Sequence, residues 1–581
     1  GDASVGGIVG ISVHDEFMQC LNSGLVGGLA DEIGGIAGRS ENSKFISCNN
    51  DYAVLFCDES GDSSDTVYFR DLVKKTREKI MAMTIDEKNL FHSEVVQKMF
   101  TYGVQVVPAA VIGVLAYYAI NSLLLQTNLV ETLSVGAVAM EDGFAAVSMI
   151  SCVMASAIAI VVAVTITAIM LSIDYDYVGG ICGKAEYCAF ESCTNNAKLY
   201  SDDDFCGGIV GYAWECTINN CLNTGSLSND GANSLGSIVG CCRHYTKVTN
   251  CVSTRDKPIM GQTSSGTNSS NDVSEETGNN YRLKNDDNSN IHKSYEMQVD
   301  NVKLADGTVA IWLNNGAYNR ENGIRPWRQN LSGELDDCPV LDAAHNEVLP
   351  KDLPHIAIKT EDDLRAFAQK VNDGEQFCNA VLYNNIEMTP DRQWTPIGTK
   401  DHRWRGVFDG QGYTIYGLKC SVESNSEEGA GLFGTVDVHA DIRNIIIDSS
   451  CEIENNSATG AGGIVGTVRN NSRGWGNIVI RGCGNKGNIK GYQHVGGILG
   501  RVINDNEDSK VQVAVDSCYH EGSVMADGYS GLLCGYMQDY GVVTNCWSSG
   551  SLKQSGNNRV FSMNNPSGEA EYFVGYDQRL T

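Results

Sequence analysis

A Gly-Gly-apolar-x-Gly cassette recurs along this chain, and a cysteine follows it at a regular distance. Four copies keep an offset of ten residues between the last glycine and the cysteine: Gly10 and Cys20, Gly38 and Cys48, Gly183 and Cys193, and Gly211 and Cys221. Looser copies join Gly240 to Cys251, Gly466 to Cys483, Gly500 to Cys518, and Gly535 to Cys546. Neighbouring short cassettes lie about 28 residues apart. Such a period indicates stacked units that share their core with their neighbours.

The content of one unit predicts short strands. Apolar pairs such as Ile209 and Val210 fit strands, and the Asn and Gly residues between them fit tight turns. We therefore expect a mainly β fold, a right-handed parallel β-helix or β-solenoid in two arrays, with Cys, Ile and Val pointing inward. The 63 glycines and only 9 prolines of the chain agree with an ordered, turn-rich structure.

Several of these cassettes resemble a known repeat family. Gly431-Leu432-Phe433-Gly434, Gly497-Ile498-Leu499-Gly500 and Gly208-Ile209-Val210-Gly211 resemble the GLUG-type repeats of bacterial surface proteins. The residues from Asp363 to Phe367, from Trp394 to Gly398 and from Phe408 to Ile415 look like the segment that opens such an array, and Trp327 to Asp342 looks like one that closes an array. The resemblance implies an adhesin-like protein at the cell surface or outside the cell. It concerns architecture and names no site.

The order of these segments predicts the domain organisation. We expect the first array at 1–56 and 177–260, starting within a repeat at Gly1, with a different kind of segment inserted at 57–176. A polar loop or linker at 261–303 and a closing segment at 304–350 follow. The second array spans 351–581, with its opening segment at 354–420 and its repeats at 431–556.

The inserted segment separates Gly38 from Gly183 and has a different character. Residues 66–100 read as a helix rich in Lys and Arg near its start, and the runs at 104–125 and 144–173 contain no charged residue. About 20 apolar residues cross a bilayer core, so both runs are long enough. We expect an α-helical apolar hairpin, and the sequence leaves open whether it is anchored in a membrane or packed between subunits.

Cysteine usage and charge limit the cofactors and partners. The 21 cysteines are not arranged in the paired spacing of zinc sites, so a column of buried thiols is favoured. Disulfides remain an alternative for the additional cysteines, which are Cys182, Cys188, Cys206, Cys216, Cys241 and Cys242. Calcium at Asp202-Asp203-Asp204 is the one cofactor considered. A net charge of −29 argues against a nucleic-acid partner.

No catalytic motif is found, and no catalytic, cofactor or metal residue is predicted. The turn Asp409-Gly410-Gln411-Gly412 is expected to shape a corner of the array, and four tryptophans are expected to cover its ends: Trp312, Trp327, Trp394 and Trp404.

These observations predict a non-enzymatic surface or extracellular protein for adhesion, binding or self-assembly. Its partners would be host or cell-surface ligands, or other copies of itself. The alternatives are a pore-forming toxin or effector that uses residues 66–173, and a glycan-active β-helix enzyme.

Overall fold

The computed structural model describes residues 4–28, 32–52, 54–56, 177–201, 205–229, 234–261, 273–274, 277–284, 296–318, 326–423, 426–470, 474–504, 509–537, 541–554, 561–564 and 570–574. The expected helix at 66–100, the apolar runs at 104–125 and 144–173, and the calcium candidates Asp202 to Asp204 lie outside this part of the chain. The expectation of a mainly β protein with parallel sheets is confirmed. None of the described helices is long and apolar enough to cross a membrane.

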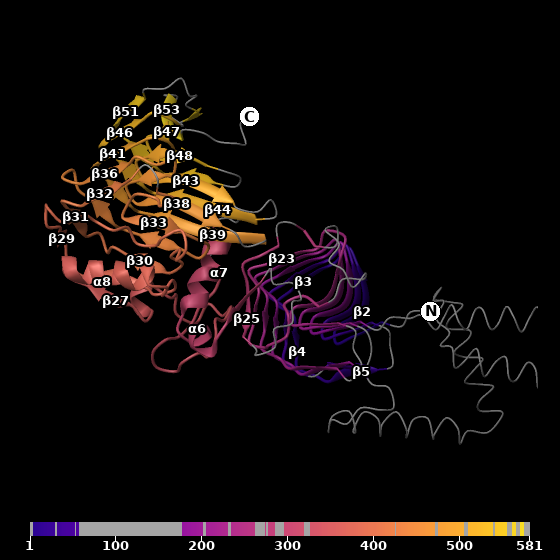
Figure 1. The fold of residues 1–581 in the computed structure, drawn as a ribbon. Helices are drawn as coiled ribbons and strands as arrows, with labels where there is room; N and C mark the ends of the chain where they lie inside the picture. The colour runs from indigo at the N-terminus through magenta and orange to yellow at the C-terminus, as the bar shows by residue number, and fades with distance from the viewer. Residues whose placement is uncertain are drawn as a thin grey trace, which may run out of the picture.

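The first array consists of five parallel sheets (Figure 1). Each strand from β1 to β19 pairs with the strand five positions later in the chain, whereas β24, β25 and β26 pair one after another. The first sheet consists of β1 (Ser4–Gly6), β6 (Glu32–Gly34), β11 (Tyr177–Gly179), β16 (Phe205–Gly207) and β21 (Ser234–Gly236). The second sheet consists of β2 (Val9–Val13), β7 (Ala37–Glu41), β12 (Cys182–Glu186), β17 (Val210–Trp214) and β22 (Val239–Arg243). A third is β3 (Glu16–Met18), β8 (Lys44–Ile46), β13 (Ala189–Glu191), β18 (Thr217–Asn219), β23 (Lys247–Thr249). The fourth sheet consists of β4 (Leu21–Asn22), β9 (Asn49–Asn50), β14 (Thr194–Asn195), β19 (Leu222–Asn223), β24 (Val252–Ser253), β25 (Asn280–Leu283) and β26 (Glu296–Val299). The fifth sheet consists of β5 (Val26–Gly28), β10 (Val54–Phe56), β15 (Leu199–Ser201) and β20 (Leu227–Asn229).

The second array also has five sheets, and no described strand belongs to both arrays. Its longest sheet is β27 (Ile356–Ile358), β28 (Ala380–Leu382), β30 (Val407–Asp409), β34 (Asp441–Arg443), β39 (Gly474–Arg481), β44 (Ser509–Asp516), β49 (Val542–Thr544). Another sheet consists of β29 (Ile386–Glu387), β31 (Thr414–Tyr416), β35 (Ile446–Ile447), β40 (Gly484–Asn485), β45 (Tyr519–His520) and β50 (Trp547–Ser548). A third consists of β32 (Lys419–Val422), β36 (Glu452–Asn455), β41 (Asn488–Gly491), β46 (Ser523–Ala526) and β51 (Ser551–Gln554). The fourth sheet consists of β33 (Phe433–Val436), β38 (Val465–Asn470), β43 (Leu499–Asn504), β48 (Cys534–Tyr536), β53 (Ala570–Val574) and β52 (Phe561–Asn564). The fifth consists of β37 (Ala461–Gly462), β42 (Val495–Gly496) and β47 (Ser530–Gly531). Among these strands, β52 and β53 pair in antiparallel fashion.

The cassette glycine is required by the close approach of neighbouring strands. Gly183 and Gly211 occupy equivalent places on β12 and β17, where Cys182 pairs with Val210. A Cβ atom on Gly211 would lie 2.6 Å from the carbonyl oxygen of Gly183 and 2.8 Å from the amide of Val178. A Cβ on Gly500 in the second array would lie 2.3 Å from the carbonyl oxygen of Gly466. The repeated glycine is therefore explained by space that backbone atoms already occupy.

The repeated cysteine follows a corner residue in the left-handed conformation. Ser192 and Asn220 precede Cys193 and Cys221 with φ of 54° and 52°, and Ser517 precedes Cys518 with φ of 54°. Ser and Asn side chains are short, and Asn in particular tolerates this region of backbone space. The corner turns the cysteine into the core, so both arrays use the same local device before the next strand.

Two helices join the arrays. Helices α6 (Asn301–Ala305) and α7 (Thr308–Tyr318) lie between them (Figure 1). Trp312 and Leu313 of α7 pack in a cluster with Tyr281 of the first array. Ala310 and Ile311 pack in another cluster with Val407 of the second array. A helix that is buried on opposite sides in this way belongs to the cores of both arrays.

Helix α8 (Glu361–Asn372) lies at the beginning of the second array, next to β27 (Figure 1). Thr360 and Asp363 form a capping box at its first turn, and Phe367 and Val371 face the core. A short 3₁₀ helix, Pro350–Asp352, precedes it. Helix α8 covers the apolar face of the first strands of the second array.

Candidate ligand-binding cleft

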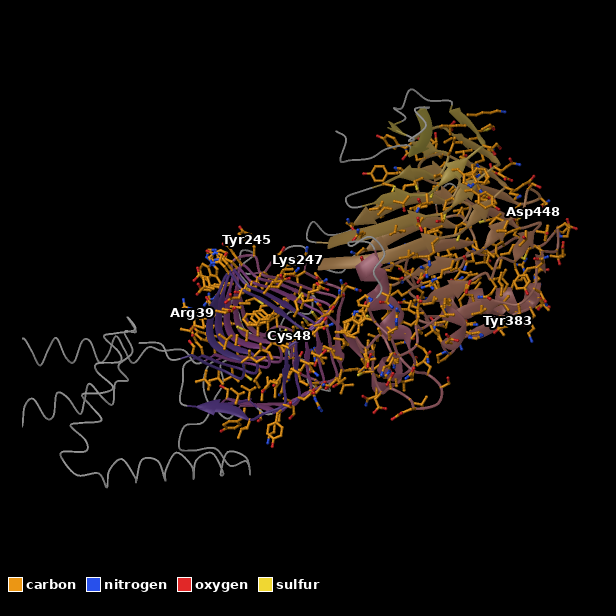
Figure 2. All side chains as sticks on the ribbon, turned by 180° about the vertical axis from the view of Figure 1, so that it is seen from behind. Arg39, Cys48, Tyr245, Lys247, Tyr383 and Asp448 are labelled. Atoms are coloured by element: carbon orange, nitrogen blue, oxygen red, sulfur yellow. The ribbon has the colours of Figure 1, made fainter. Side chains whose placement is uncertain are left out.

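The sequence-predicted repeat residues come together in columns inside the arrays. Strand register places Gly10, Gly38, Gly183, Gly211 and Gly240 in one column across β2, β7, β12, β17 and β22. Cys20, Cys48, Cys193, Cys221 and Cys251 all belong to, or pack against, one core cluster. Cys483, Cys518 and Cys546 do the same in the second array, where Gly466, Gly500 and Gly535 occupy the glycine column. Figure 2 shows Cys48 within the first array and Arg39 and Tyr245 at its outer surface.

The described cysteines are free thiols, and most of them are buried. The Cys193 thiol donates to the carbonyl oxygens of Phe45 and Glu191 at 3.5 and 3.6 Å. Burial raises the pKa of Cys193 and Cys221 well above the usual range, and it raises that of Cys206 to about 12. Such thiols remain protonated and act as packing groups. The additional cysteines Cys182, Cys188, Cys206, Cys216, Cys241 and Cys242 are also buried free thiols.

The turn at Asp409 has a structural arrangement. The Asp409 carboxylate accepts hydrogen bonds from the Gln411 amide at 3.0 Å and from the Asn444 side chain at 3.1 Å. Gly412 has a φ of 79°, which favours glycine, whereas Gly410 is needed because a Cβ would meet the Asn444 carbonyl oxygen at 2.5 Å. The four tryptophans, Trp312, Trp327, Trp394 and Trp404, are all buried and present no ring for a ligand to stack on.

The candidate site is a surface cleft of about 330 Å³ in the second array, which we call the arginine cleft. Seven residues line it: Ser426, Glu427, Ala458, Thr459, Arg469, Arg501 and Ile503. Register pairs Arg469 with Ile503, and Thr467 with Arg501, across β38 and β43. Since side chains alternate between the two faces of a strand, both arginines project outward while Val468 and Val502 enter the core.

Hydrogen bonds hold the walls of the arginine cleft in place. Nη1 of Arg501 donates to the Ala458 carbonyl oxygen at 3.5 Å. Nη1 of Arg403 donates to the carbonyl oxygen of Arg469 at 3.3 Å. The Thr459 hydroxyl accepts from Nδ2 of Asn455 at 2.9 Å, and Asn455 is fully buried. The polar groups of the cleft therefore stand on a fixed frame.

Aromatic rings lie beside the cleft, on the next strand and before it. Tyr536 of β48 is in register with Arg501, and its ring lies 5.1 Å from that of His494. His494 also stacks on Tyr529 at a centroid distance of 5.6 Å. Burial and the positive charge of Arg501 lower the pKa of His494 to about 4. This imidazole is neutral at physiological pH, so the positive charge of the cleft comes from the guanidinium groups.

The one carboxylate among the lining residues is already engaged. Oε2 of Glu427 accepts from Nζ of Lys400 at 2.6 Å, and this hydrogen bond holds the pKa of Glu427 below its usual range. A general acid requires the opposite shift. The arrangement of guanidinium groups, hydroxyls and aromatic rings is suited to hold an anionic, hydroxyl-bearing ligand.

A second groove of about 280 Å³ lies on another face of the same array. Its polar side chains are Gln393, Lys419, Ser421, Glu452, Glu454, Asn488 and Lys490. Nζ of Lys490 donates to Oε1 of Glu454 at 2.7 Å. Because charges of both signs alternate here, this groove has no bias toward an anion. It provides a control for experiments on the arginine cleft.

Sequence reasoning did not identify the arginine cleft. Its residues come from three successive repeats, and Ser426 and Arg501 are far apart in the chain. Arg469 and Arg501 do follow their cassettes closely, but at different positions: three residues after Gly466 and one residue after Gly500. The sequence therefore shows that two successive units each carry an arginine. Only the strand register shows that both arginines lie on the same face.

The comparisons with known proteins leave the family open, and no family model matches the chain. A curated protein from Haloquadratum walsbyi named Halomucin is 28% identical over 136 residues, which is 21% of this chain and 1% of that protein. This chain thus spans a small part of the relative that it matches. A crystal structure from Bacteroides ovatus described as a "putative immunoglobulin A1 protease" covers 38% of this chain and 83% of its own, at 18% identity and a TM-score of 0.27. A similarity at that score carries no argument about fold or function.

Proposed function

We propose that this chain is a non-enzymatic β-solenoid of the cell surface or extracellular space, and that it binds an anionic glycan through the arginine cleft. The in-register parallel pairing of every fifth strand in the first array supports the solenoid architecture. The resemblance of the cassettes to GLUG-type repeats supports the location. We base the proposed role in adhesion on this architecture and this location together.

The observation that carries the binding proposal is the placement of Arg469 and Arg501 on adjacent strands of one outward face. Guanidinium groups bind carboxylates in a planar, two-bonded geometry, and they do so better than lysine does. The Ser426 hydroxyl and the nearby Tyr536 ring suit the hydroxyl groups and apolar face of a sugar. A uronic-acid polymer combines these features.

Binding calorimetry with a polyuronate and with neutral dextran tests this proposal. We expect the polyuronate alone to bind, and we expect Arg501→Gln to weaken binding at least about tenfold. Lys490→Gln in the second groove removes the same charge and should leave the affinity unchanged. Equal affinity for the neutral polymer, or equal losses in both variants, would refute the proposal.

The apolar runs at 104–125 and 144–173 favour a second candidate, a membrane-inserting protein that uses residues 66–173. Each run reaches the length that crosses a bilayer. Dye release from liposomes at neutral pH distinguishes this candidate from the first. Leakage that requires residues 66–173 would support insertion, and intact liposomes would count against it.

A further inference from the structure

A column of hydroxyl and thiol side chains follows the corner between the second and third sheets of the first array. The amide of Asp15 donates to Oγ of Ser43 at 3.1 Å, and the amide of Ser43 donates to Sγ of Cys188 at 3.4 Å. The amide of Cys188 donates to Sγ of Cys216 at 3.4 Å, and that of Cys216 donates to Oγ1 of Thr246 at 3.3 Å. Each of these corner amides is therefore capped by a side chain of the next unit.

The capping of these amides does not require cysteine. Ser43 and Thr246 make the same contact with a hydroxyl group, at distances no longer than those of the two thiols. A hydroxyl oxygen is also the better acceptor, because sulfur accepts hydrogen bonds only weakly. The presence of thiols in two successive units, Cys188 and Cys216, is thus not explained by the capping alone.

Strand register places Cys188 and Cys216 side by side. Strand β12 is in register with β17 before the corner, and β13 is in register with β18 after it. The amide of Thr217 donates to the Cys188 carbonyl oxygen at 2.9 Å, so the pairing continues through the corner. Neighbouring strands lie about 4.8 Å apart, and a disulfide needs Cα atoms separated by roughly 4.4 to 6.8 Å. The backbone separation is therefore suited to a disulfide.

The two thiols differ in acidity. A hydrogen bond from the Cys216 thiol lowers the pKa of Cys188 against the opposing effect of burial, and the Ser43 amide contributes to the decrease. Burial raises the pKa of Cys216 well above its usual range. Cys188 therefore forms the thiolate more readily, and Cys216 supplies a neighbouring thiol. A thiolate beside a second thiol is the arrangement on which oxidants act.

Two other sets of thiols in the first array each lack one of these features. Cys193 and Cys221 also lie in successive units, but burial raises the pKa of both well above the usual range. Cys206 pairs in register with Val178 and Leu235, so the described strands place no thiol at the equivalent position beside it. These cysteines provide controls within the same chain.

The second array repeats the arrangement with Cys518 and Cys546. The amide of Cys518 donates to Sγ of Cys546 at 3.3 Å, and strand register is kept on both sides of the pair. The Cys518 thiol lowers the pKa of Cys546, whereas burial raises that of Cys518 well above its usual range. The two arrays thus share the amide contact to sulfur and the difference in acidity.

We propose that Cys188 and Cys216 are a site of oxidation by hydroperoxides, which join them in a disulfide between successive units, and that Cys518 and Cys546 are the equivalent site of the second array. This inference concerns the covalent state of the scaffold. It goes beyond glycan binding and does not depend on the arginine cleft.

The reaction has two steps. The Cys188 thiolate attacks the hydroperoxide and breaks its O–O bond, which leaves a sulfenic acid on Cys188 and an alkoxide that takes up the proton released by Cys188. The Cys216 sulfur then attacks the Cys188 sulfur and displaces the hydroxyl group, which leaves as water with the proton of the Cys216 thiol. Together the two thiols lose two electrons and two protons, and the hydroperoxide is reduced to an alcohol and water.

A small oxidant can reach the pair through the corner. Both thiols are buried, but Cys188 directly follows Tyr187, whose side chain is 49% exposed. Hydrogen peroxide is close to water in size, so a small local opening of the corner admits it. Disulfides persist outside the cell, which is the location in the proposed function, and a cross-link there restricts the unfolded chain. We therefore expect the oxidised form to accumulate and to be the more stable one.

Peptide mapping of the full, reduced chain after treatment with hydrogen peroxide tests the proposal. Unfolding in the presence of N-ethylmaleimide blocks the remaining thiols before digestion. We expect a peptide pair that links Cys188 to Cys216 and another that links Cys518 to Cys546, and dithiothreitol should separate both. Failure of the Cys188 and Cys216 peptides to link would overturn the proposal.

The control cysteines show whether proximity alone explains the reaction. A Cys193–Cys221 link should form at least about tenfold more slowly than the Cys188–Cys216 link, because each unit of pKa changes the thiolate fraction tenfold. Cys206 should be recovered as the maleimide adduct. Equal rates for the two pairs would refute the role of the Cys188 thiolate.

Serine variants assign the two roles and retain a capping group, as Ser43 and Thr246 do. Cys216→Ser removes the thiol that displaces water, so the Cys188 sulfenic acid should persist and be trapped by dimedone. Cys188→Ser should give no dimedone adduct at Cys216. An adduct at Cys216 in that variant would reverse the assignment and overturn it.

The urea midpoint gives a readout that does not rely on peptides. Hydrogen peroxide should raise the midpoint of the wild type, and dithiothreitol should restore the starting value. A chain that carries both Cys216→Ser and Cys518→Ser should begin near the midpoint of the reduced wild type and show no increase. The same increase in the double variant would place the effect of the oxidant elsewhere and contradict the proposal.

Discussion

The Tyr281 hydroxyl oxygen lies 3.1 Å from Nδ1 of His439, and this contact links the two arrays. The Tyr281 hydroxyl has a single proton, which it donates to Oδ1 of Asn279. His439 therefore donates its Nδ1 proton to Tyr281. Asn315 of α7 makes a second link, because its Nδ2 donates to Oδ2 of Asp441 at 2.7 Å. The joint between the arrays is thus a set of directional bonds as well as an apolar contact.

Three buried histidines, one at the joint and two within the second array, make stability depend on pH. Burial, assisted by the charge of Arg405, lowers the pKa of His439 to about 3, and burial lowers those of His494 and His520 to about 4. Their unfolded values are near 6.5, so between pH 6.5 and 4 the unfolded chain binds more protons. Stability is complete above pH 6.5 and falls as the pH decreases toward the folded values.

We expect urea midpoints to fall between pH 7 and pH 5, with each histidine contributing up to about 1.4 kcal/mol per pH unit. The variant His439→Asn should lower stability at pH 7 and show a smaller decrease on acidification than the wild type. His14, an exposed residue of the first unit, serves as the control in His14→Asn. Parallel pH profiles for wild type and His439→Asn would show that His439 does not contribute to the acid sensitivity.

The cassette glycine predicts a sharp response to one methyl group. Gly211→Ala places a Cβ 2.6 Å from a backbone oxygen that cannot move without shifting the neighbouring strand. We expect a loss of about 2 to 4 kcal/mol in the free energy of unfolding, measured with urea. Gly24→Ala is the matched control, since its Cβ would meet no atom closer than the Asn22 side chain at 3.7 Å. Similar losses in both variants would show that crowding is not the reason for the cassette.

The insertion at 57–176 is predicted to be removable. Strand β10 pairs with β5 and β15, and β11 pairs with β6 and β16, in the register of their neighbours. Three residues separate β5 from β6, and three separate β15 from β16. A chain in which a three-residue linker joins Phe56 to Tyr177 should keep the circular dichroism spectrum of the arrays and their urea midpoint. Loss of the fold would show that the insertion belongs to the core.

The same deletion serves as the control for the liposome experiment. If residues 66–173 insert into membranes, the full chain should release dye and the shortened chain should not. Release by both chains would assign the activity to the arrays and refute the role of the insertion.

Cysteine reactivity separates buried thiols from disulfides. The Cys518 thiol donates a hydrogen bond that lowers the pKa of Cys546, whereas burial raises that of Cys378 to about 11. At pH 8 in dilute solution, alkylation followed by peptide mass spectrometry should therefore modify Cys546 first. Cys193 and Cys221 should react only after unfolding. Recovery of a peptide pair linked through Cys48 and Cys193 would contradict the column of free thiols.

The repeat architecture was visible in the sequence because it depends on local chemistry. The glycine fits beside a backbone oxygen, and the cysteine follows a left-handed corner, so both appear at fixed positions in each unit. Strand register then follows from the period. The parallel, mainly β character of the fold could be predicted from Gly183, Cys193 and their equivalents.

The joint and the arginine cleft could not be predicted in the same way. The contact of Asn315 with Asp441 joins residues 126 positions apart and has no counterpart in the repeat. The sequence of α7 has five apolar residues in succession, Val309 to Leu313, which indicates burial but not the two surfaces that bury it. Arg501 acquires its neighbours only when β38, β43 and β48 are aligned.

The junction between β10 and β11, where residues 57–176 are inserted, has a consequence for the history and use of this scaffold. Pairing between strands sets the spacing of the units, so the chain between one unit and the next can change length without disturbing either. Evolution can add a passenger segment at such a point in a single step, and protein engineers can do the same. The intervals after β5 and β15 are equivalent sites for displaying a foreign domain along one edge of the array.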